Sequence, residues 1–310
     1  MGNTLILGGF GFIGTNVVQE LLNRGKNDII IFELKNIFIQ DPSLLEKVKV
    51  VYGDFNNEKD TEVIFQENQI DLVIHLISAT IPSNENIIYD INANLVNTIR
   101  LLELMKKYQV KKIVFLSSGG TIYGVSETGY FKETDPTNPI SSYGVVKLAI
   151  EKVLYLYNQL SGIDYLILRP SNPFGEYHTS TKQGFINIAL KKIMSGEKIV
   201  IWGDGEVIRD YIYIKDLASI IADLIELEIS NDIINIGSGE GHTLNNILEI
   251  LREQIGEFEV EYNAPRKFDV PCTILNIDKM MSLLKYPKKT DLNWAVAKTF
   301  NWLDTELHQS

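Results

Sequence analysis

The 310-residue sequence contains a single cysteine, Cys272. One cysteine excludes an intrachain disulfide, and this usage is typical of proteins from the reducing cytoplasm. No local cluster of the kind that activates a catalytic thiol surrounds Cys272. The four histidines show no spacing typical of a zinc site, so we predict that the protein binds no metal.

Long apolar runs and excess positive charge are also missing. No stretch approaches the roughly 20 apolar residues that a membrane span requires, and the N-terminus lacks the basic region of a signal peptide. The net charge is −11, which disfavours a broad nucleic-acid-binding surface. A few local arginines and backbone amides still suffice for a small anionic ligand. We therefore predict a cytoplasmic protein with no nucleic-acid or membrane partner.

The first half of the chain alternates strand and helix patterns. Short runs rich in Val, Ile and Leu predict buried parallel strands at 4–7, 28–33, 48–51, 72–76, 112–116 and 165–168. Helical patterns lie between them at 15–24, 61–67, 86–108 and 141–160. This alternation predicts an α/β fold with a doubly wound parallel sheet of the Rossmann type.

The alternation becomes irregular from about residue 172, and no linker of biased composition separates the two parts. We therefore expect two closely packed units, a Rossmann domain of residues 1–171 and a smaller lobe of residues 172–310. Segments of the second half are expected to return to the large sheet. Ligands of open α/β sheets bind at the carboxyl ends of the strands. The smaller lobe is expected to cover that edge.

Three glycines, Gly8, Gly11 and Gly14, directly follow the first predicted strand and precede a predicted helix. A strand that turns through glycines into a helix presents bare backbone N–H groups and a positive helix end to a pyrophosphate. The triplet alone is weak evidence, but its position between a strand and a helix makes it specific. The segment predicts a dinucleotide site, and a ligand-free glycine turn is the alternative.

Two acidic residues downstream indicate which dinucleotide binds. Glu33 ends the second predicted strand, where a carboxylate accepts hydrogen bonds from ribose hydroxyls and repels a 2′-phosphate. This favours NAD over NADP, although nearby Lys35 can weaken the preference; an ordinary solvated glutamate is the alternative. Asp54 is either a partner of the adenine amino group or the cap of a turn.

The chain contains three Tyr-x-x-x-Lys spacings, at 108/112, 143/147 and 211/215. Only Tyr143 and Lys147 open a predicted helix, where positions four apart share a face. A phenol has a pKa of about 10, and an ammonium about 4 Å away lowers it by roughly three units before burial opposes the shift. Tyr143 could then take a proton from a sugar hydroxyl as the nicotinamide takes a hydride, with Lys147 also binding the nicotinamide ribose. An aromatic and a lysine on an amphipathic helix is the alternative.

The combination of these motifs is similar to that of a known family. The segments that carry the likeness are 8–14, Ser-Ser-Gly-Gly-Thr-Ile-Tyr-Gly at 117–124, Tyr143-x-x-x-Lys147, 169–175 and 202–211. The sequence resembles the extended short-chain dehydrogenase/reductases, and within them the nucleotide-sugar epimerases, above all UDP-glucose and UDP-N-acetylglucosamine 4-epimerases. The likeness extends from residue 3 to about residue 303. It implies NAD as cofactor, a UDP-sugar as favoured substrate and a homodimer.

The resemblance also implies roles for individual residues. Asn172 is expected to contact the sugar diphosphate, Arg209 and Arg266 its phosphates, and Asp269 the uridine ribose. Asn94 resembles the asparagine that braces the loop beside the nicotinamide. Trp202 is expected to contact the substrate. The further residues expected to contact the cofactor are Phe12, Ile13, Phe55, Leu76, Ser117 and Pro170.

The sequence departs from the family pattern at Gly119, where the family usually has a Ser or Thr that binds the reacting oxygen. Ser118 or Thr121 is predicted to take over this role, with Ser118 preferred. The dehydratase branch has an Asp-Glu pair where this chain has Gly120 and Thr121, which argues against a 4,6-dehydratase. Thr273 stands where some epimerases narrow the sugar pocket with a tyrosine, so we expect room for a 2-acetamido sugar.

Three functions remain in competition. The first is an NAD-dependent nucleotide-sugar 4-epimerase with Tyr143 as base and then acid. The second is a one-way NAD(P)H-dependent reductase or dehydrogenase of a deoxysugar nucleotide, and the third is a catalytically idle NAD-sensing protein. The two long helices carry apolar stripes that allow either pairing in a dimer or packing on the chain's own sheet. The stripe residues are Leu95, Ile99, Leu102, Val146, Ile150, Val153 and Tyr157.

Overall fold

The computed structural model describes the whole chain except residues 1, 266–269, 285–286, 288 and 310. A seven-stranded, fully parallel sheet forms its centre, in the order β11-β7-β5-β4-β1-β2-β3. Its strands are β1 (Asn3–Leu7), β2 (Ile29–Glu33), β3 (Lys49–Tyr52), β4 (Ile70–His75), β5 (Lys112–Leu116), β7 (Asp164–Pro170) and β11 (Asp232–Ile236). The predicted doubly wound α/β fold is confirmed.

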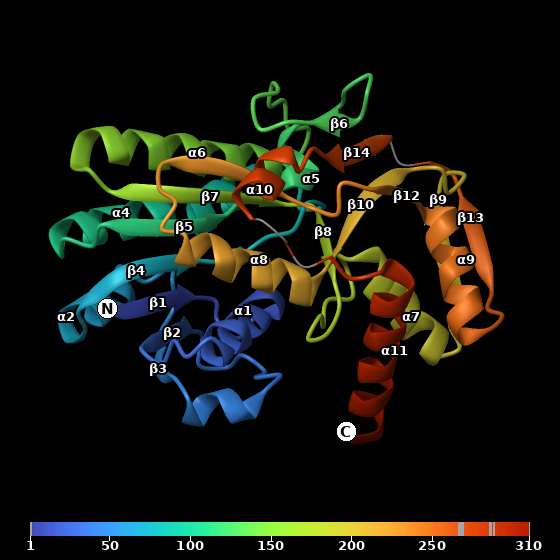
Figure 1. Cartoon of the computed structure of the whole chain (residues 1–310), viewed down its shortest axis with the longest axis horizontal. Helices are drawn as coiled ribbons and strands as arrows, with labels where there is room; N and C mark the ends of the chain where they lie inside the picture. Colours follow the sequence, from blue (N-terminus) through green and yellow to red (C-terminus); the bar gives the residue numbers. More distant parts are fainter. Residues whose placement is uncertain (1, 266–269, 285–286, 288, 310) are drawn as a thin grey trace.

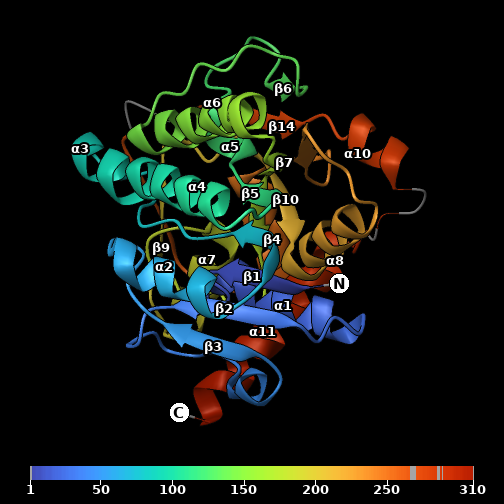
Figure 2. The ribbon, with the colours of Figure 1, turned by 90° about the vertical axis from the view of Figure 1, so that its left-hand side faces the viewer.

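Helices cover both faces of this sheet because its strands are apolar on both sides. Alternate residues of β1 belong to different cores: Ile6 packs with α1 and α8, and Leu5 and Leu7 pack with α2, α4 and α6. The covering helices are α1 (Phe12–Asn23), α2 (Glu58–Glu67), α4 (Asn97–Lys107), α6 (Ser142–Ser161) and α8 (Ile214–Glu226). Figure 2 shows α4 and α6 on one side of the sheet and α1 on the other.

The helix predicted at 86–108 is not uniform. It consists of α3 (Ile87–Asp90), a π-helical turn η2 (Ile91–Val96) and α4. A π turn inserts a residue and is common at functional sites. Here it contains Asn94. Of the predicted stripes, Leu102, Val146 and Ile150 are buried in the chain's own core, so these residues pack on the sheet as the second alternative proposed.

A smaller lobe lies at the carboxyl edge of the large sheet (Figure 1). Its main sheet has the order β12-β10-β14-β6, with β8 also paired to β10, and β9 pairs with β13. The strands are β6 (Tyr130–Phe131), β8 (Asn172–Phe174), β9 (Ile199–Trp202), β10 (Ile208–Tyr213), β12 (Gly241–Thr243), β13 (Val260–Asn263) and β14 (Cys272–Leu275). The remaining helices are η1 (Pro42–Glu46), α5 (Gly119–Ile122), α7 (Phe185–Met194), α9 (Leu244–Ile255), α10 (Asp278–Leu283) and α11 (Leu292–Gln309).

The chain crosses between the two units in both directions. Strand β11 comes from the second half of the sequence and joins the large sheet, whereas β6 comes from the first half and joins the lobe. None of the described helices is both long and apolar enough to cross a membrane. The order of the large sheet reverses between β1 and β4, which places the turn after β1 at the switch point where ligands of such folds bind.

Candidate functional site

The glycine turn lies directly after β1 and leads into α1. Gly8 has φ +82°, and the Gly11 N–H donates to the Gly8 carbonyl at 3.2 Å. A Cβ at Gly14 would lie 2.1 Å from the Gly8 oxygen and 2.8 Å from Gly9 backbone atoms, so only glycine fits there. The first N–H groups of a helix have no partners within the helix. The tight turn therefore presents the positive end of α1 at the switch point, as an NAD pyrophosphate requires.

Glu33 is buried beneath this turn at the end of β2. Its carboxylate accepts hydrogen bonds from the N–H of Phe10 at 3.3 Å and of Leu34 at 3.2 Å. Burial raises the pKa of Glu33, and both N–H groups oppose the shift. Glu33 is 6% exposed, so it is not an ordinary solvated glutamate. Exposed Asp54 accepts from the Asn56 N–H at 2.9 Å and thus caps a turn, and its adenine contact stays a prediction.

The remaining predicted cofactor contacts gather at the same edge. Each lies at or shortly after the carboxyl end of a strand of the large sheet, or at the start of α1: Phe12, Ile13, Phe55, Leu76, Ser117 and Pro170. The fold therefore brings together residues that are up to 158 positions apart, from Phe12 to Pro170 (170 − 12). A glycine turn, a buried carboxylate and an apolar rim at one edge fit an NAD molecule, and their individual contacts stay predictions.

Tyr143 and Lys147 lie in the first two turns of α6. Ser141 caps the helix by accepting a hydrogen bond from the Gly144 N–H at 3.2 Å. The Lys147 ammonium is buried, donates to the Leu116 carbonyl at 2.8 Å and lies 5.6 Å from the centre of the Tyr143 ring. The bond to Leu116 fixes the ammonium to the end of β5. The pair therefore shares one helix face, close to the end of a central strand.

Burial decides the protonation of this pair. It raises the pKa of Tyr143 to about 12, where a hydrogen bond from Ser78 opposes the rise and the Asp90 carboxylate adds to it. Burial likewise lowers the pKa of Lys147 to about 8, with Glu151 opposing the shift. In the ligand-free protein burial is thus the largest influence on the phenol pKa, and its lowering by the ammonium stays a prediction for the NAD-bound enzyme.

Three hydroxyl groups bear on the partner of Tyr143, the predicted Ser118 and Thr121 and the unpredicted Ser78. Ser118 is half-buried at the start of α5, and the buried Thr121 Oγ1 has no hydrogen-bond partner. Ser78, in the loop after β4, opposes the rise in the pKa of Tyr143, and the roles of Ser118 and Thr121 stay predictions. The sequence offered one signal for Ser78, its position shortly after the end of a predicted strand at the carboxyl edge.

Asn94 holds the loop that contains Ser78. Its Oδ1 accepts from the Ala79 N–H at 2.8 Å, and its Nδ2 donates to the Thr80 Oγ1 at 3.2 Å. The asparagine projects from the π-helical turn and is buried. The resemblance implied an asparagine that braces a loop at this edge, and these contacts have that form.

A cavity of about 600 Å³ opens next to this edge, in the smaller lobe. Asn172, Trp202 and Arg209 line it, together with Lys182 and Phe185. Asn172 Nδ2 donates to the Asp210 carbonyl at 2.8 Å, and Arg209 Nη1 donates to the Ile208 carbonyl at 2.8 Å. The structure thus brings three of the predicted substrate contacts to one cavity.

Three further sequence predictions concern this lobe. Arg266 and Asp269 lie outside the described residues. Thr273 is buried on β14, and its Oγ1 has no hydrogen-bond partner. Within the described part of the chain, no group of three or more His, Cys, Asp or Glu residues could hold a metal ion.

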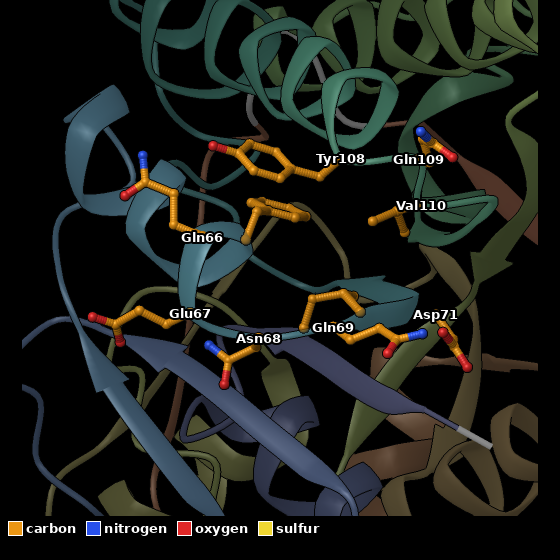
Figure 3. A pocket seen from close by; sticks show the side chains of 10 residues that line it. Gln66, Glu67, Asn68, Gln69, Asp71, Tyr108, Gln109 and Val110 are labelled. Carbon is orange, nitrogen blue, oxygen red and sulfur yellow. The ribbon is translucent and has the colours of Figure 1, made fainter.

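A second depression lies at the opposite edge of the large sheet. Figure 3 shows that its rim carries mainly polar side chains, among them Gln66 near the end of α2, Asn68 and Gln69 from the α2–β4 connection, and Gln109 after α4. This depression lies at the amino ends of the strands, beside the start of β4. None of the predicted site residues lines it, so it is separate from the site described above.

Comparison with known proteins decides the family. The model of the NAD dependent epimerase/dehydratase family matches residues 4–237. The chain belongs to this family. A putative UDP-glucose 4-epimerase of Methanocaldococcus jannaschii is 36% identical over 96% of this chain and 97% of its own length. A dTDP-4-dehydro-6-deoxyglucose reductase of Escherichia coli is 35% identical over 90% of each chain.

A solved structure extends the likeness of this epimerase/dehydratase chain to three dimensions. The crystal structure of the Thermus thermophilus UDP-glucose 4-epimerase in complex with NAD has a TM-score of 0.89, with 29% identity over 97% of this chain and 99% of that chain. The predicted family and NAD as its cofactor are confirmed at this level. The protein is an enzyme of the nucleotide-sugar epimerase/dehydratase family.

Proposed function

We propose that this enzyme is an NAD-dependent nucleotide-sugar 4-epimerase acting on UDP-glucose/UDP-galactose or on UDP-N-acetylglucosamine/UDP-N-acetylgalactosamine. The observation that carries the proposal is the pairing of Tyr143 and Lys147 on one face of α6, with Lys147 bound to the end of β5 at the edge where the glycine turn also lies. Asn172, which lines the cavity together with Arg209, follows β7 at the same edge. A sugar whose diphosphate binds in that cavity would reach the phenol. Relatives named as UDP-glucose 4-epimerases over nearly the full chain support the same reaction.

Each side chain of the site has a separate role in this reaction. NAD, when bound, supplies the hydride acceptor and later the hydride donor. Tyr143 removes the proton of the sugar 4-hydroxyl and returns it once the opposite face of the ketone is presented. Lys147, held at the Leu116 carbonyl, contributes positive charge next to the phenol. Arg209 is proposed to bind phosphate, and Asn172 the diphosphate, so that the sugar is anchored while it rotates.

The decisive test is incubation of the purified enzyme with a panel of UDP-, dTDP-, GDP- and CDP-sugars without added cofactor, with products resolved by NMR. The proposal expects a mixture of C4 epimers and no net NADH consumption. Turnover of UDP-N-acetylglucosamine is expected from the room that Thr273 leaves. If UDP-glucose is converted and UDP-N-acetylglucosamine is not, the inference from Thr273 fails.

A reductase is the second candidate, and one observation favours it. A relative named as a dTDP-4-dehydro-6-deoxyglucose reductase is 35% identical over 90% of this chain. One-for-one oxidation of NAD(P)H with a 4-keto sugar nucleotide would identify this reaction. An enzyme that works only with added NADH in that assay would overturn the epimerase proposal.

We further propose a homodimer in which α6 and the helical segment that begins with α3 pair with those of a second copy. Apolar residues remain exposed on α6 and on neighbouring α3, namely Ile88, Val145, Leu156 and Leu160. Light scattering coupled to gel filtration tests this. Leu160→Glu is expected to give monomers, whereas Leu227→Glu, at an exposed leucine after α8, is the matched control and leaves the mass unchanged. A wild-type monomer at micromolar concentration would contradict the dimer.

A further inference from the structure

Lys147 is held at the end of β5 by two contacts. Its ammonium donates to the Leu116 carbonyl at 2.8 Å and lies 4.8 Å from the centre of the Phe115 ring. An ammonium has three N–H groups. Among the described residues, the Leu116 carbonyl is the acceptor that this side chain reaches, so two N–H groups remain for a ligand. The Leu116 carbonyl therefore decides where the positive charge lies at the cofactor edge.

Helix α6 binds the end of β5 a second time, one helical turn later. Ser117 directly follows Leu116, and its hydroxyl donates to Glu151 Oε1 at 2.5 Å. Glu151 lies four positions after Lys147, and residues four apart share one face of a helix. Two successive turns of α6 are thus bound to two consecutive residues at the end of β5. We call these two hydrogen bonds, Lys147–Leu116 and Ser117–Glu151, the α6–β5 clamp.

Glu151 is itself fixed by the neighbouring strand β7. Arg169 donates to both of its oxygens, with Nε–Oε1 at 3.1 Å and Nη2–Oε2 at 2.6 Å. The Ser117 N–H donates to the carbonyl of Leu168, the residue before Arg169, at 2.8 Å. Ser117, Glu151 and Arg169 are each at most 3% exposed. The hydrogen bonds close a ring from β5 through α6 to β7, so the clamp cannot shift without breaking a buried hydrogen bond.

This ring also limits what the Ser117 hydroxyl can do. A serine hydroxyl has one proton, and Ser117 donates it to the Glu151 carboxylate. The hydroxyl oxygen can still accept a hydrogen bond, but no proton is left for a cofactor oxygen. The cofactor contact of Ser117 stays a prediction, and the bond that its side chain makes lies within the protein.

We infer that Ser117 and Glu151 are positioning residues, which hold the Leu116 carbonyl, and with it the Lys147 ammonium, where the nicotinamide ribose binds. The inference rests on the proposed function and on the predicted contact of Lys147 with that ribose. Without the Ser117 hydroxyl, α6 and the end of β5 lose one of their two bonds. NAD binding then weakens, because Lys147 must be ordered at the moment of binding and is no longer held in place beforehand.

A double-mutant cycle on NAD affinity tests this role. Calorimetry compares the wild type with Ser117→Ala, Lys147→Met and the double variant. Lys147→Met is expected to weaken NAD binding by about tenfold or more, as for the loss of a hydrogen bond from a charged group. Ser117→Ala is expected to weaken it about fivefold. The double variant is expected to match Lys147→Met within about twofold, because Ser117 acts through Lys147.

A control variant separates this role from a general loss of stability. Thr299→Val removes a buried hydroxyl that donates to the Ala295 carbonyl at 2.8 Å within α11. It is expected to lower the urea denaturation midpoint and to leave the NAD affinity unchanged. If Ser117→Ala does not fold, Ser117→Cys is measured in its place, since a thiol is a weaker donor than a hydroxyl, with the same expectation for the cycle.

Three results would overturn the inference. The first is an unchanged NAD affinity in Ser117→Ala, and the second is an unchanged affinity in Lys147→Met, which would leave Ser117 nothing to position. The third is a further loss of about fivefold when Ser117→Ala is added to Lys147→Met, because Ser117 would then act on NAD without the lysine. None of these measurements requires turnover of a sugar. A failure of the proposed epimerase reaction in the NMR panel therefore leaves this test decisive.

Discussion

A buried ion pair next to Lys147 gives the sharpest prediction about stability. Arg169 donates to Glu151 twice, with Nε–Oε1 at 3.1 Å and Nη2–Oε2 at 2.6 Å, and both side chains are at most 3% exposed. Arg169 Nη1 also donates to the Tyr123 hydroxyl at 2.9 Å, and the Ser117 hydroxyl donates to Glu151. Removing one partner leaves the other charge buried and unpaired, which costs about 3–5 kcal/mol.

A double-mutant cycle measures this coupling. We expect Glu151→Gln and Arg169→Met each to lower the free energy of unfolding by about 3–5 kcal/mol, read from urea denaturation. The double variant should cost clearly less than the sum of the two, because it leaves no unpaired charge. Glu62→Gln, in the exposed pair with Lys107, is the control and should hardly change the denaturation midpoint. Additive losses from the two buried substitutions would refute the reasoning.

Three further predictions follow from single contacts. Gly14→Ala should abolish NAD binding measured by calorimetry, since the added Cβ would lie 2.1 Å from the Gly8 oxygen. Gly25→Ala is the control, because a Cβ there meets nothing within 4 Å, and it should leave the NAD affinity unchanged despite some backbone strain. Normal NAD affinity of Gly14→Ala would contradict the assigned turn. Burial lowers the pKa of His75 to about 3 from 6.5, so the contribution of neutral His75 to stability is complete above pH 6.5 and is lost as the pH falls toward 3. His75→Leu should therefore weaken the fall of the unfolding free energy between pH 6.5 and 3. An unchanged fall in this variant would contradict the role of His75. Burial lowers the pKa of Lys147 to about 8 from 10.5, so between these values the unfolded chain binds one more proton than the folded protein. The free energy of unfolding should therefore fall by about 3 kcal/mol as the pH drops from 10.5 to 8. Lys147→Met should remove this pH dependence in the ligand-free protein, and its persistence would show that Lys147 is not its source.

The large sheet was predictable because its strands are buried on both faces. Runs such as 4–7 and 112–116 are apolar almost throughout, and each is bounded by polar residues or glycines. The π-helical turn within the helix predicted at 86–108 was not, because its sequence keeps a helical pattern and its irregularity depends on tertiary contacts of Asn94. The two-residue strand β6 was missed for a related reason: it exists only through pairing with β14, 142 residues later (272 − 130).

The functional site also divides into local features, which the sequence predicts, and long-range contacts, which it does not. Tyr143 and Lys147 were found because their spacing is a property of one helix, and the glycine turn because it is contiguous in sequence. Ser78 was missed because its effect on Tyr143 joins a loop after β4 to a helix 65 residues away (143 − 78), and no local pattern records that effect. The effect of burial on the phenol pKa was not predictable, because the sequence shows the ammonium and conceals the depth of burial.

These ionisation properties explain why the tyrosine needs more than one partner. Burial holds the pKa of Tyr143 at about 12, so lowering it to near neutrality requires a shift of several units. One positive charge about 5 Å away, at an effective dielectric of 20, contributes about 3 kcal/mol, or roughly two units. The pKa of about 12 already includes the opposing effect of Ser78, so Ser78 lowers it no further. We therefore expect Tyr143 to act as a base only when the positive charge of an oxidised nicotinamide is bound beside it.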